Sequence, residues 1–177
     1  MNSKIKRIVM AALMASMVCV ATMIIKIPSP MKGYINLGDC VVLLCGWLLA
    51  PGYGFVAAGL GSALADLFSG YITYAPATFI IKGSMALVMF AFLELVKHKT
   101  TKMTKAGKIG KLLLQIAAAL IAEITMILGY FVFEGFLYGL GASLVNIPAN
   151  AVQGVAGLII GLILIRIFEK IKIFNLE

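Results

Sequence analysis

Several charged and amide side chains interrupt stretches of this sequence that are otherwise apolar. Lys82 is the only charged residue in the run YAPATFIIKGSMALVMF, residues 74–90. An ammonium or carboxylate group in an apolar segment is costly unless it reaches water, pairs with an opposite charge or lines a cavity. These positions therefore indicate either structural pairs or a polar binding site.

The polar residues with a plausible binding role come from five separate apolar stretches. Asn146, Asn150 and Gln153 follow one another at spacings of four and three residues, which puts them on one face of a helix. Tyrosines near the segment ends could flank a flat ring. The candidate ligand-contacting residues are Asp39, Asp66, Tyr74, Lys82, Glu123, Tyr130, Glu134, Asn146, Asn150 and Gln153.

Each of these residue types also has an ordinary structural role. Asp39 could cap the start of a helix, and Asp66 could form a structural ion pair with Lys82. Glu134 could be an interfacial residue. The amide face could join two helices, and the tyrosines Tyr34, Tyr71, Tyr74 and Tyr138 could form an aromatic belt.

The composition indicates a membrane protein. Of the 177 residues, 62% are hydrophobic and 12% are charged, and the mean hydropathy is +1.06. A soluble domain of this length has too little interior for so much apolar surface. The chain is expected to be one transmembrane domain, residues 1–177, and its +8 net charge is better explained by membrane topology than by nucleic acid.

Six apolar segments are predicted to be membrane helices. They cover residues 6–27, 37–50, 53–69, 75–96, 112–133 and 145–168. The first is longer than the apolar part of a signal peptide and is interpreted as a retained helix. The second is too short to cross a bilayer comfortably and is expected to pack against other helices. The fold class is therefore an all-α bundle of six transmembrane helices.

The basic residues predict the orientation of this bundle. Twelve of the 15 Lys and Arg residues lie near the N-terminus, in the loop around residues 97–111 or near the C-terminus. With six spans these three regions share one side, which the positive-inside rule identifies as the cytoplasm. Both termini are thus expected to be cytoplasmic, in a bacterial cell membrane. Most candidate residues then lie in the outer half, which predicts an outward-facing pocket rather than a pore.

Small residues recur at a spacing of four along two segments. Ala11 and Ala15 do so in the first, and Ala57, Gly61 and Ala65 in the third. This pattern favours close helix packing. Motifs for a phosphate loop, a metalloprotease, a thiol–disulfide pair or a serine hydrolase are absent from the sequence. No cofactor, metal or enzymatic activity is expected. Two other functions remain open: an intramembrane enzyme that uses Asp39 and Asp66, and a structural subunit of a membrane complex.

Three stretches resemble the substrate-binding S components of energy-coupling-factor (ECF) vitamin transporters, in particular the riboflavin-type group. They are GYINLGDCVVLL, GSALADLFSGYITYAPATFIIKG and NIPANAVQGVAG. The group includes proteins for pyridoxine-like and hydroxymethylpyrimidine-like compounds. The resemblance implies a six-helix fold with an extracellular vitamin site, a transmembrane scaffold partner and two cytoplasmic ATPases. It also implies that Ala11 and Ala15 contact the scaffold.

The charge of the predicted site restricts the vitamin. Four acids, Asp39, Asp66, Glu123 and Glu134, outnumber Lys82. Such a site disfavours anionic vitamins and suits a neutral or protonatable ring with several hydrogen-bonding groups. Pyridoxine-like and hydroxymethylpyrimidine-like compounds fit best, and riboflavin comes next.

Overall fold

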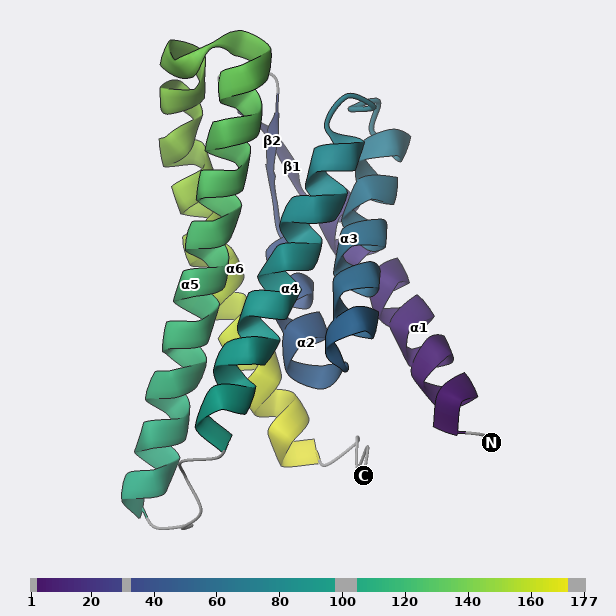
Figure 1. The fold of residues 1–177 in the computed structure, drawn as a ribbon, viewed down its shortest axis with the longest axis vertical. Helices are drawn as coiled ribbons and strands as arrows, with labels where there is room; N and C mark the ends of the chain where they lie inside the picture. The colour runs from purple at the N-terminus through teal and green to yellow at the C-terminus, as the bar shows by residue number, and fades with distance from the viewer. Residues whose placement is uncertain (1–2, 30–32, 98–104, 172–177) are drawn as a thin grey trace.

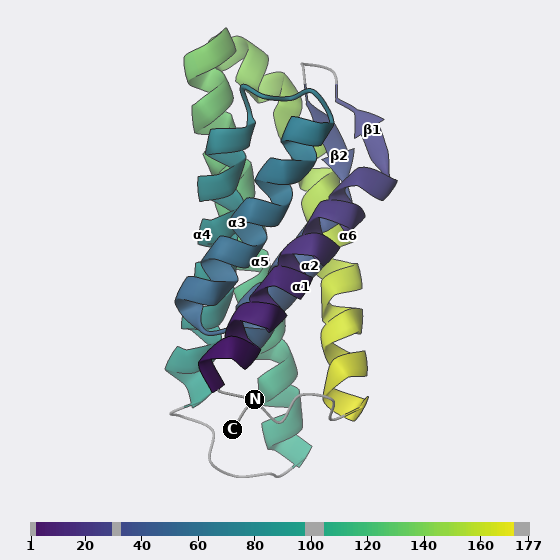
Figure 2. The same ribbon diagram turned by 90° about the vertical axis from the view of Figure 1, so that its right-hand side faces the viewer.

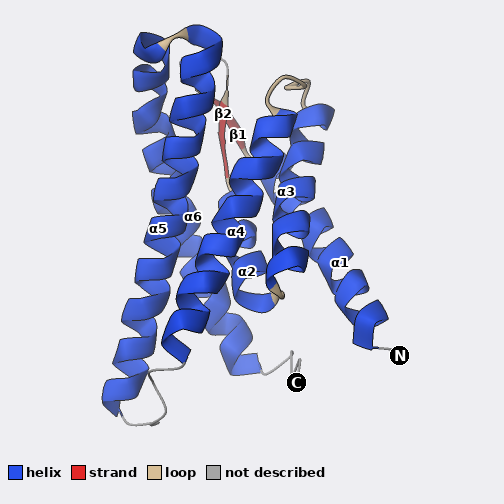
Figure 3. Cartoon of the chain, in the orientation of Figure 1, coloured by secondary structure: helices blue, strands red, loops and turns tan. Residues whose placement is uncertain are grey.

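The computed structural model describes residues 3–29, 33–97 and 105–171. Within these ranges the chain forms six helices and one two-stranded hairpin (Figures 1 and 3). The helices are α1 (Ser3–Ile24), α2 (Gly38–Leu48), α3 (Pro51–Phe68), α4 (Ala75–Lys97), α5 (Lys105–Tyr138) and α6 (Leu140–Ile171), and the strands are β1 (Lys26–Pro28) and β2 (Tyr34–Asn36).

The hairpin corrects the prediction that the first helix runs to residue 27. Helix α1 ends at Ile24, and β1 pairs with β2 in an antiparallel register that aligns Ile27 with Ile35. The β-branched Ile27 directly before Pro28 favours an extended chain over a continued helix. The fold is therefore the predicted helical bundle, with a short hairpin added between α1 and α2.

Helix α2 lies in the middle of the bundle, as Figures 1 and 2 show. Its residues from Gly38 to Gly46 are all buried, and it packs against α1, α3, α4 and α6. A Cβ atom on Gly46 would lie 2.5 Å from the carbonyl oxygen of Ala86, so glycine allows α2 and α4 to approach this closely. The prediction that the short second segment packs against other helices is confirmed.

The small-residue face of α3 packs against α1. Ala57, Gly61 and Ala65 are buried, and a Cβ atom on Gly61 would lie 2.3 Å from the carbonyl oxygen of Ala15. Ala15 is itself buried, whereas Ala11 is only partly covered. The predicted close packing is therefore confirmed, and it occurs inside this chain between α1 and α3.

Helices α5 and α6 are longer than the predicted segments 112–133 and 145–168. They contain 34 and 32 residues and are joined at Gly139, which has a φ of 87°. The apolar pattern stops at Glu134, but this carboxylate bonds to Asn146 on the neighbouring helix. This contact gives one oxygen of Glu134 a partner across the helix pair, and α5 continues beyond the point where hydropathy falls.

Four of the described helices are long and apolar enough to cross a membrane: α1, α4, α5 and α6. Their outward faces carry exposed large side chains such as Leu13, Ile80, Leu128 and Ile159, which suits a lipid environment. The described ends of the chain lie together at one end of the bundle, while the α3–α4 and α5–α6 turns lie at the other (Figure 1). Parts of the predicted basic clusters, including Lys99, Lys102 and Lys172, lie outside the described residues.

Candidate functional site

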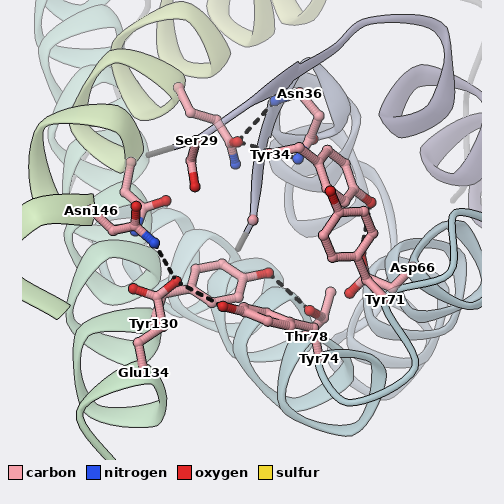
Figure 4. A pocket seen from close by; sticks show the side chains of 13 residues that line it. Ser29, Tyr34, Asn36, Asp66, Tyr71, Tyr74, Thr78, Tyr130, Glu134 and Asn146 are labelled. Carbon is pink, nitrogen blue, oxygen red and sulfur yellow. Dashed lines mark hydrogen bonds between the residues drawn. The ribbon is translucent and has the colours of Figure 1, made fainter. Parts of the chain in front are cut away.

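A polar pocket lies between the hairpin and the ends of α3, α4, α5 and α6 that face away from the chain termini (Figures 1 and 4). Each of these four helices contributes side chains to it, so its lining spans residues 29–153 of the sequence. The described lining residues are Ser29, Gly33, Tyr34, Asn36, Asp66, Tyr71, Tyr74, Thr78, Tyr130, Glu134, Asn146, Asn150 and Gln153.

The structure brings together seven of the ten predicted contact residues. They are Asp66, Tyr74, Tyr130, Glu134, Asn146, Asn150 and Gln153. The other three, Asp39, Lys82 and Glu123, do not line the pocket. They are buried at 0%, 2% and 3% exposure, in a separate charged cluster between α2, α4 and α5.

Lys82 forms its ion pair with Asp39, not with Asp66 as the sequence suggested. Two turns of helix separate the tyrosine at position 74 from the lysine at 82, so Lys82 lies deeper than the pocket lining on α4. It meets Asp39 there because α2 begins in the middle of the bundle rather than at its outer end. The buried ammonium therefore has a carboxylate partner and no direct place in the pocket.

Asp39 is not the N-cap that the sequence suggested. Leu37 occupies the N-cap position of α2, and Asp39 lies in the first helical turn, where the helix dipole favours a negative charge. Its second oxygen, Oδ2, accepts a 2.7 Å hydrogen bond from Nε2 of Gln153. Both oxygens of Asp39 are therefore engaged.

Glu123 completes the charged cluster without a hydrogen bond of its own. Both of its carboxyl oxygens are buried and have no partner among the described residues. Glycines on α6 make room for it: a Cβ atom on Gly157 would lie 2.9 Å from Oε1 of Glu123 and 2.6 Å from Cβ of Asp39. Close approach of α6 thus depends on glycine at this position.

Two carboxylates of the pocket are each only half satisfied. Oδ1 of Asp66 accepts a 2.6 Å hydrogen bond from the hydroxyl of Tyr34. Oε1 of Glu134 accepts from Nδ2 of Asn146 at 2.9 Å and from the hydroxyl of Tyr74 at 3.4 Å (Figure 4). The second oxygens, Oδ2 and Oε2, are buried without a partner among the described residues. Buried acceptors of this kind are normally satisfied, so a ligand could supply the missing donors.

Tyrosines form the aromatic side of the pocket. The ring centroids of Tyr34 and Tyr71 are 4.8 Å apart, and those of Tyr71 and Tyr74 are 6.2 Å apart. Burial, followed by the nearby Asp66 carboxylate, raises the pKa of the Tyr34 phenol above its usual value, so this hydroxyl remains a donor. Of the four tyrosines considered as a belt, only Tyr138 does not line the pocket.

Sequence reasoning missed part of the lining. Ser29, Gly33, Asn36 and Thr78 were not singled out, and Tyr34 and Tyr71 were considered only as flanking residues. Thr78 carries a usable signal, because it lies four residues after Tyr74 and four before Lys82, on the same helix face. Ser29, Gly33 and Asn36 carry none, because their position depends on a hairpin that the sequence reading did not include.

The open space inside the pocket is small in this conformation. Its volume is about 30 Å³, which is room for about two water molecules. A ligand with an aromatic ring therefore fits only if the lining side chains or the hairpin move apart.

The arrangement suits binding rather than catalysis. Asp39 and Asp66 have different partners, so the pair required by the intramembrane-enzyme alternative is not formed. The described residues contain no group of three or more His, Cys, Asp or Glu side chains that could hold a metal ion. What the pocket offers is acceptors, amides and aromatic faces.

Comparison with known proteins agrees with the fold. Two solved structures resemble the chain. The first is the S component of a bacterial ECF transporter, with a TM-score of 0.70 and 23% identity, and the match covers 97% of this chain and 99% of the other. The second is the S component for biotin from an ECF-type ABC transporter, with a TM-score of 0.50 and 20% identity, and the match covers 93% of both chains.

Two curated proteins are similar in sequence. One, from Pyrococcus woesei, is described as an uncharacterized protein in the gap 3' region and is 37% identical over 145 residues, which are 81% of this chain and 88% of that protein. The other is the thiamine precursor transporter HmpT of Lactococcus lactis subsp. cremoris (strain MG1363), 22% identical over 98% of this chain and 94% of that protein.

The family model for the S component of ECF-type riboflavin transporters matches residues 2–170, nearly the whole chain. This family consists of transporter subunits, not enzymes, and its apolar helices make its members multi-pass membrane proteins. The resemblance seen in the sequence is thereby confirmed, and the chain belongs to the ECF-type riboflavin transporter S component family.

Proposed function

We propose that this S component captures a small heterocycle that donates hydrogen bonds, a pyridoxine-like or hydroxymethylpyrimidine-like compound. The observation that carries the proposal is the pair of half-satisfied carboxylates, Asp66 and Glu134, in one pocket. None of the described lining residues is a lysine or arginine. A ring with amino or hydroxyl donors, or one that is protonated when bound, would satisfy both acids.

The tyrosines support an aromatic ligand. A flat ring can stack on phenol faces such as those of Tyr34, Tyr71 and Tyr74. The amides of Asn146 and Asn150 can donate to ring nitrogens or hydroxyl groups and accept from amino groups. The described pocket lining contains two carboxylates and no lysine or arginine, so the site disfavours anionic vitamins.

The relatives favour the same chemical class. HmpT is named as a thiamine precursor transporter, and the family description names riboflavin. Riboflavin is the second candidate because of that description. Its larger ring system requires a wider opening of a cavity that measures about 30 Å³.

Binding by the purified protein tests this proposal. Isothermal titration in detergent would compare hydroxymethylpyrimidine, pyridoxine and riboflavin, with biotin as an anionic control, alongside mass spectrometry of any co-purified molecule. We expect one of the first two to bind tightly at one molecule per chain, without chemical change. Tight binding of biotin, or turnover of a bound compound, would contradict the proposal.

The partners proposed for the chain are an ECF transmembrane scaffold subunit and two cytoplasmic ATPases. An apolar groove between α1 and α3 supports scaffold docking. It is lined by Ile8, Ala11, Ala12, Ala15, Ala50, Gly52, Tyr53, Val56, Ala57 and Leu60. Ala11 is the more accessible of the two predicted scaffold contacts, because Ala15 is largely covered by α3.

A bulky residue in this groove tests the docking. We expect Ala11→Leu to retain ligand binding but to lose co-purification with the scaffold and ATPases. Ala91→Leu, at an exposed position of α4, is the matched control and should keep the complex. Loss of the complex in both variants, or in neither, would contradict docking at this groove.

The proposed orientation has the pocket outside and both termini in the cytoplasm, in a bacterial cytoplasmic membrane with six spans. The described basic residues Lys4, Lys6, Arg7, Arg166 and Lys170 lie towards the end that carries the termini, which agrees with the positive-inside rule. A reporter that is active only in the cytoplasm, fused to the C-terminus, should be active. An inactive reporter would reverse the orientation.

A further inference from the structure

A continuous series of hydrogen bonds connects Lys82 to the hairpin. Lys82 Nζ donates to Oδ1 of Asp39, and Oδ2 of Asp39 accepts from Nε2 of Gln153 at 2.7 Å. Oε1 of Gln153 then accepts from both nitrogens of Asn36, the backbone N at 2.9 Å and Nδ2 at 3.2 Å. We call these four residues, Lys82, Asp39, Gln153 and Asn36, the relay.

Groups that can only donate or only accept fix the direction of the relay. The Asp39 carboxylate accepts, so Gln153 must present its NH₂ group to it. The backbone N–H of Asn36 donates, so it must meet the oxygen of Gln153. The backbone N–H of Gly38 donates to Oδ1 of Asn36 at 2.9 Å, which leaves Nδ2 for Gln153. Neither amide can flip without losing a bond.

The relay is shielded from water along its whole length. Its members are exposed by only 0–7%. In such surroundings hydrogen bonds are strong, and an unpaired group is costly. Removal of one member is therefore expected to disturb the next, rather than to be repaired by solvent.

Lys82 also supports the floor of the pocket. Its Nζ lies 5.6 Å from the ring centroid of Tyr130, within the range of a cation–π contact. The hydroxyl of Tyr130 lies 3.0 Å from Oγ1 of Thr78, and both of these residues line the pocket. Lys82 thus contacts the pocket from below without being part of its lining.

We propose that Lys82 is a positioning residue. It acts through Asp39 and Gln153 to hold Asn36, and with it β2, over the pocket. Its effect on ligand affinity rests on the proposed function, whereas its effect on the hairpin does not. Lys82 therefore serves the binding site at a distance and neither contacts the ligand nor pairs with Asp66.

Two variants cut the relay in different ways. Lys82→Met combined with Asp39→Leu removes both members of the ion pair, so that neither of the two is left without its partner. Gln153→Leu leaves the ion pair intact and removes only the step between Asp39 and Asn36. Lys111→Met is the control for losing a lysine, because Lys111 pairs with Glu169 at the opposite end of the bundle and its side chain is 56% exposed.

Hydrogen–deuterium exchange without ligand gives the first readout. Peptides that cover residues 33–37 should exchange at least about tenfold faster in both relay variants. In Gln153→Leu the Asn36 amide loses its acceptor, and in the double variant Gln153 loses the Asp39 carboxylate that orients it. Peptides from the middle of α5 and the Lys111→Met protein should exchange as in the wild type. Unchanged exchange of residues 33–37 in both relay variants would overturn the proposal, and so would an equal increase along the whole chain.

Titration with hydroxymethylpyrimidine gives the second readout. The Lys82→Met, Asp39→Leu protein should bind it at least about tenfold more weakly than the wild type. Wild-type affinity together with a loosened hairpin would overturn the role in positioning. If the wild type itself does not bind this compound, the proposed function fails for it, and the exchange measurement alone decides the role of Lys82.

Discussion

The pocket and the charged cluster beneath it use the same kinds of side chain in different ways. In the cluster, both oxygens of Asp39 are engaged, by Lys82 and by Gln153. In the pocket, Asp66 and Glu134 each keep one buried oxygen without a partner among the described residues. A carboxylate whose bonds are complete stabilises the fold, whereas one that is half satisfied beside a cavity is prepared for a ligand. Pairing thus separates the role of Asp39 from those of Asp66 and Glu134, whereas Glu123 lies in the cluster with neither oxygen bonded to a described residue.

The largest expected effect is loss of the Asp39 carboxylate alone. Asp39→Leu leaves the ammonium of Lys82 buried and unpaired, which should lower the free energy of unfolding by about 3–5 kcal/mol. Thermal unfolding in detergent measures this change. The double variant with Lys82→Met should recover most of the loss, since the unpaired ammonium is removed as well. A single variant as stable as the wild type would remove the distinction between cluster and pocket.

A pocket carboxylate should show the opposite behaviour. Asp66→Asn should weaken ligand binding about tenfold, or about 1.4 kcal/mol, because one acceptor oxygen becomes a donor. Stability should change far less than in Asp39→Leu, since Oδ2 of Asp66 has no described partner to lose. Glu134→Gln is the matched variant on α5. Titration and thermal unfolding of the same samples separate the two effects, and unchanged binding in both variants would contradict the pocket assignment.

Removing a neutral donor should have a smaller effect. Tyr34→Phe deletes the hydroxyl that donates to Oδ1 of Asp66 and keeps the ring beside Tyr71. We expect a loss of about 1 kcal/mol in stability or binding. Tyr53→Phe, on α3 and outside the pocket lining, is the control for a lost phenol hydroxyl. Equal effects of the two substitutions would mean that the Tyr34 bond has no special place in the site.

The smallest effect is expected at the far end of the bundle. Lys111→Met removes a 3.0 Å ion pair with Glu169, in which the lysine side chain is 56% exposed. Pairs of this kind contribute between about 0 and 1 kcal/mol, and ligand binding should not change. A loss of stability as large as that of Asp39→Leu would show that exposure does not distinguish the two ion pairs.

Apolar periodicity predicted much of the architecture and little of the pairing. The six helices, the internal packing of α2 and the small-residue faces of α1 and α3 follow from runs of apolar and small residues. That these two faces pack against each other is known only from the structure. The pairing of Lys82 with Asp39 does not follow from such runs, because it depends on the position of the start of α2 in the bundle. That position is set by the hairpin between residues 26 and 36, which is too short to leave a periodic signal.

The same distinction applies to the residues of the candidate site. Residues on one helix face, such as Asn146, Asn150 and Gln153, could be grouped from their spacing and do line the pocket. Asn36 could not, since its place depends on the hairpin and on Gln153 from a distant helix. Local spacing therefore predicted the helical walls of the pocket, and only the tertiary structure adds the side that the hairpin covers.

The unequal lengths of the helices have a consequence for the surrounding bilayer. The apolar span of α5, Ile109–Tyr138, has 30 residues and α3 has 18, which correspond to about 45 Å and 27 Å along their axes. The hydrocarbon layer is about 30 Å thick. The α5 side of the protein is therefore longer than the hydrocarbon layer of an average membrane, and the α3 side is slightly shorter. Hydrophobic mismatch of this kind favours tilting and local thinning, so the acyl-chain length of the lipids becomes a control on how steeply the protein leans.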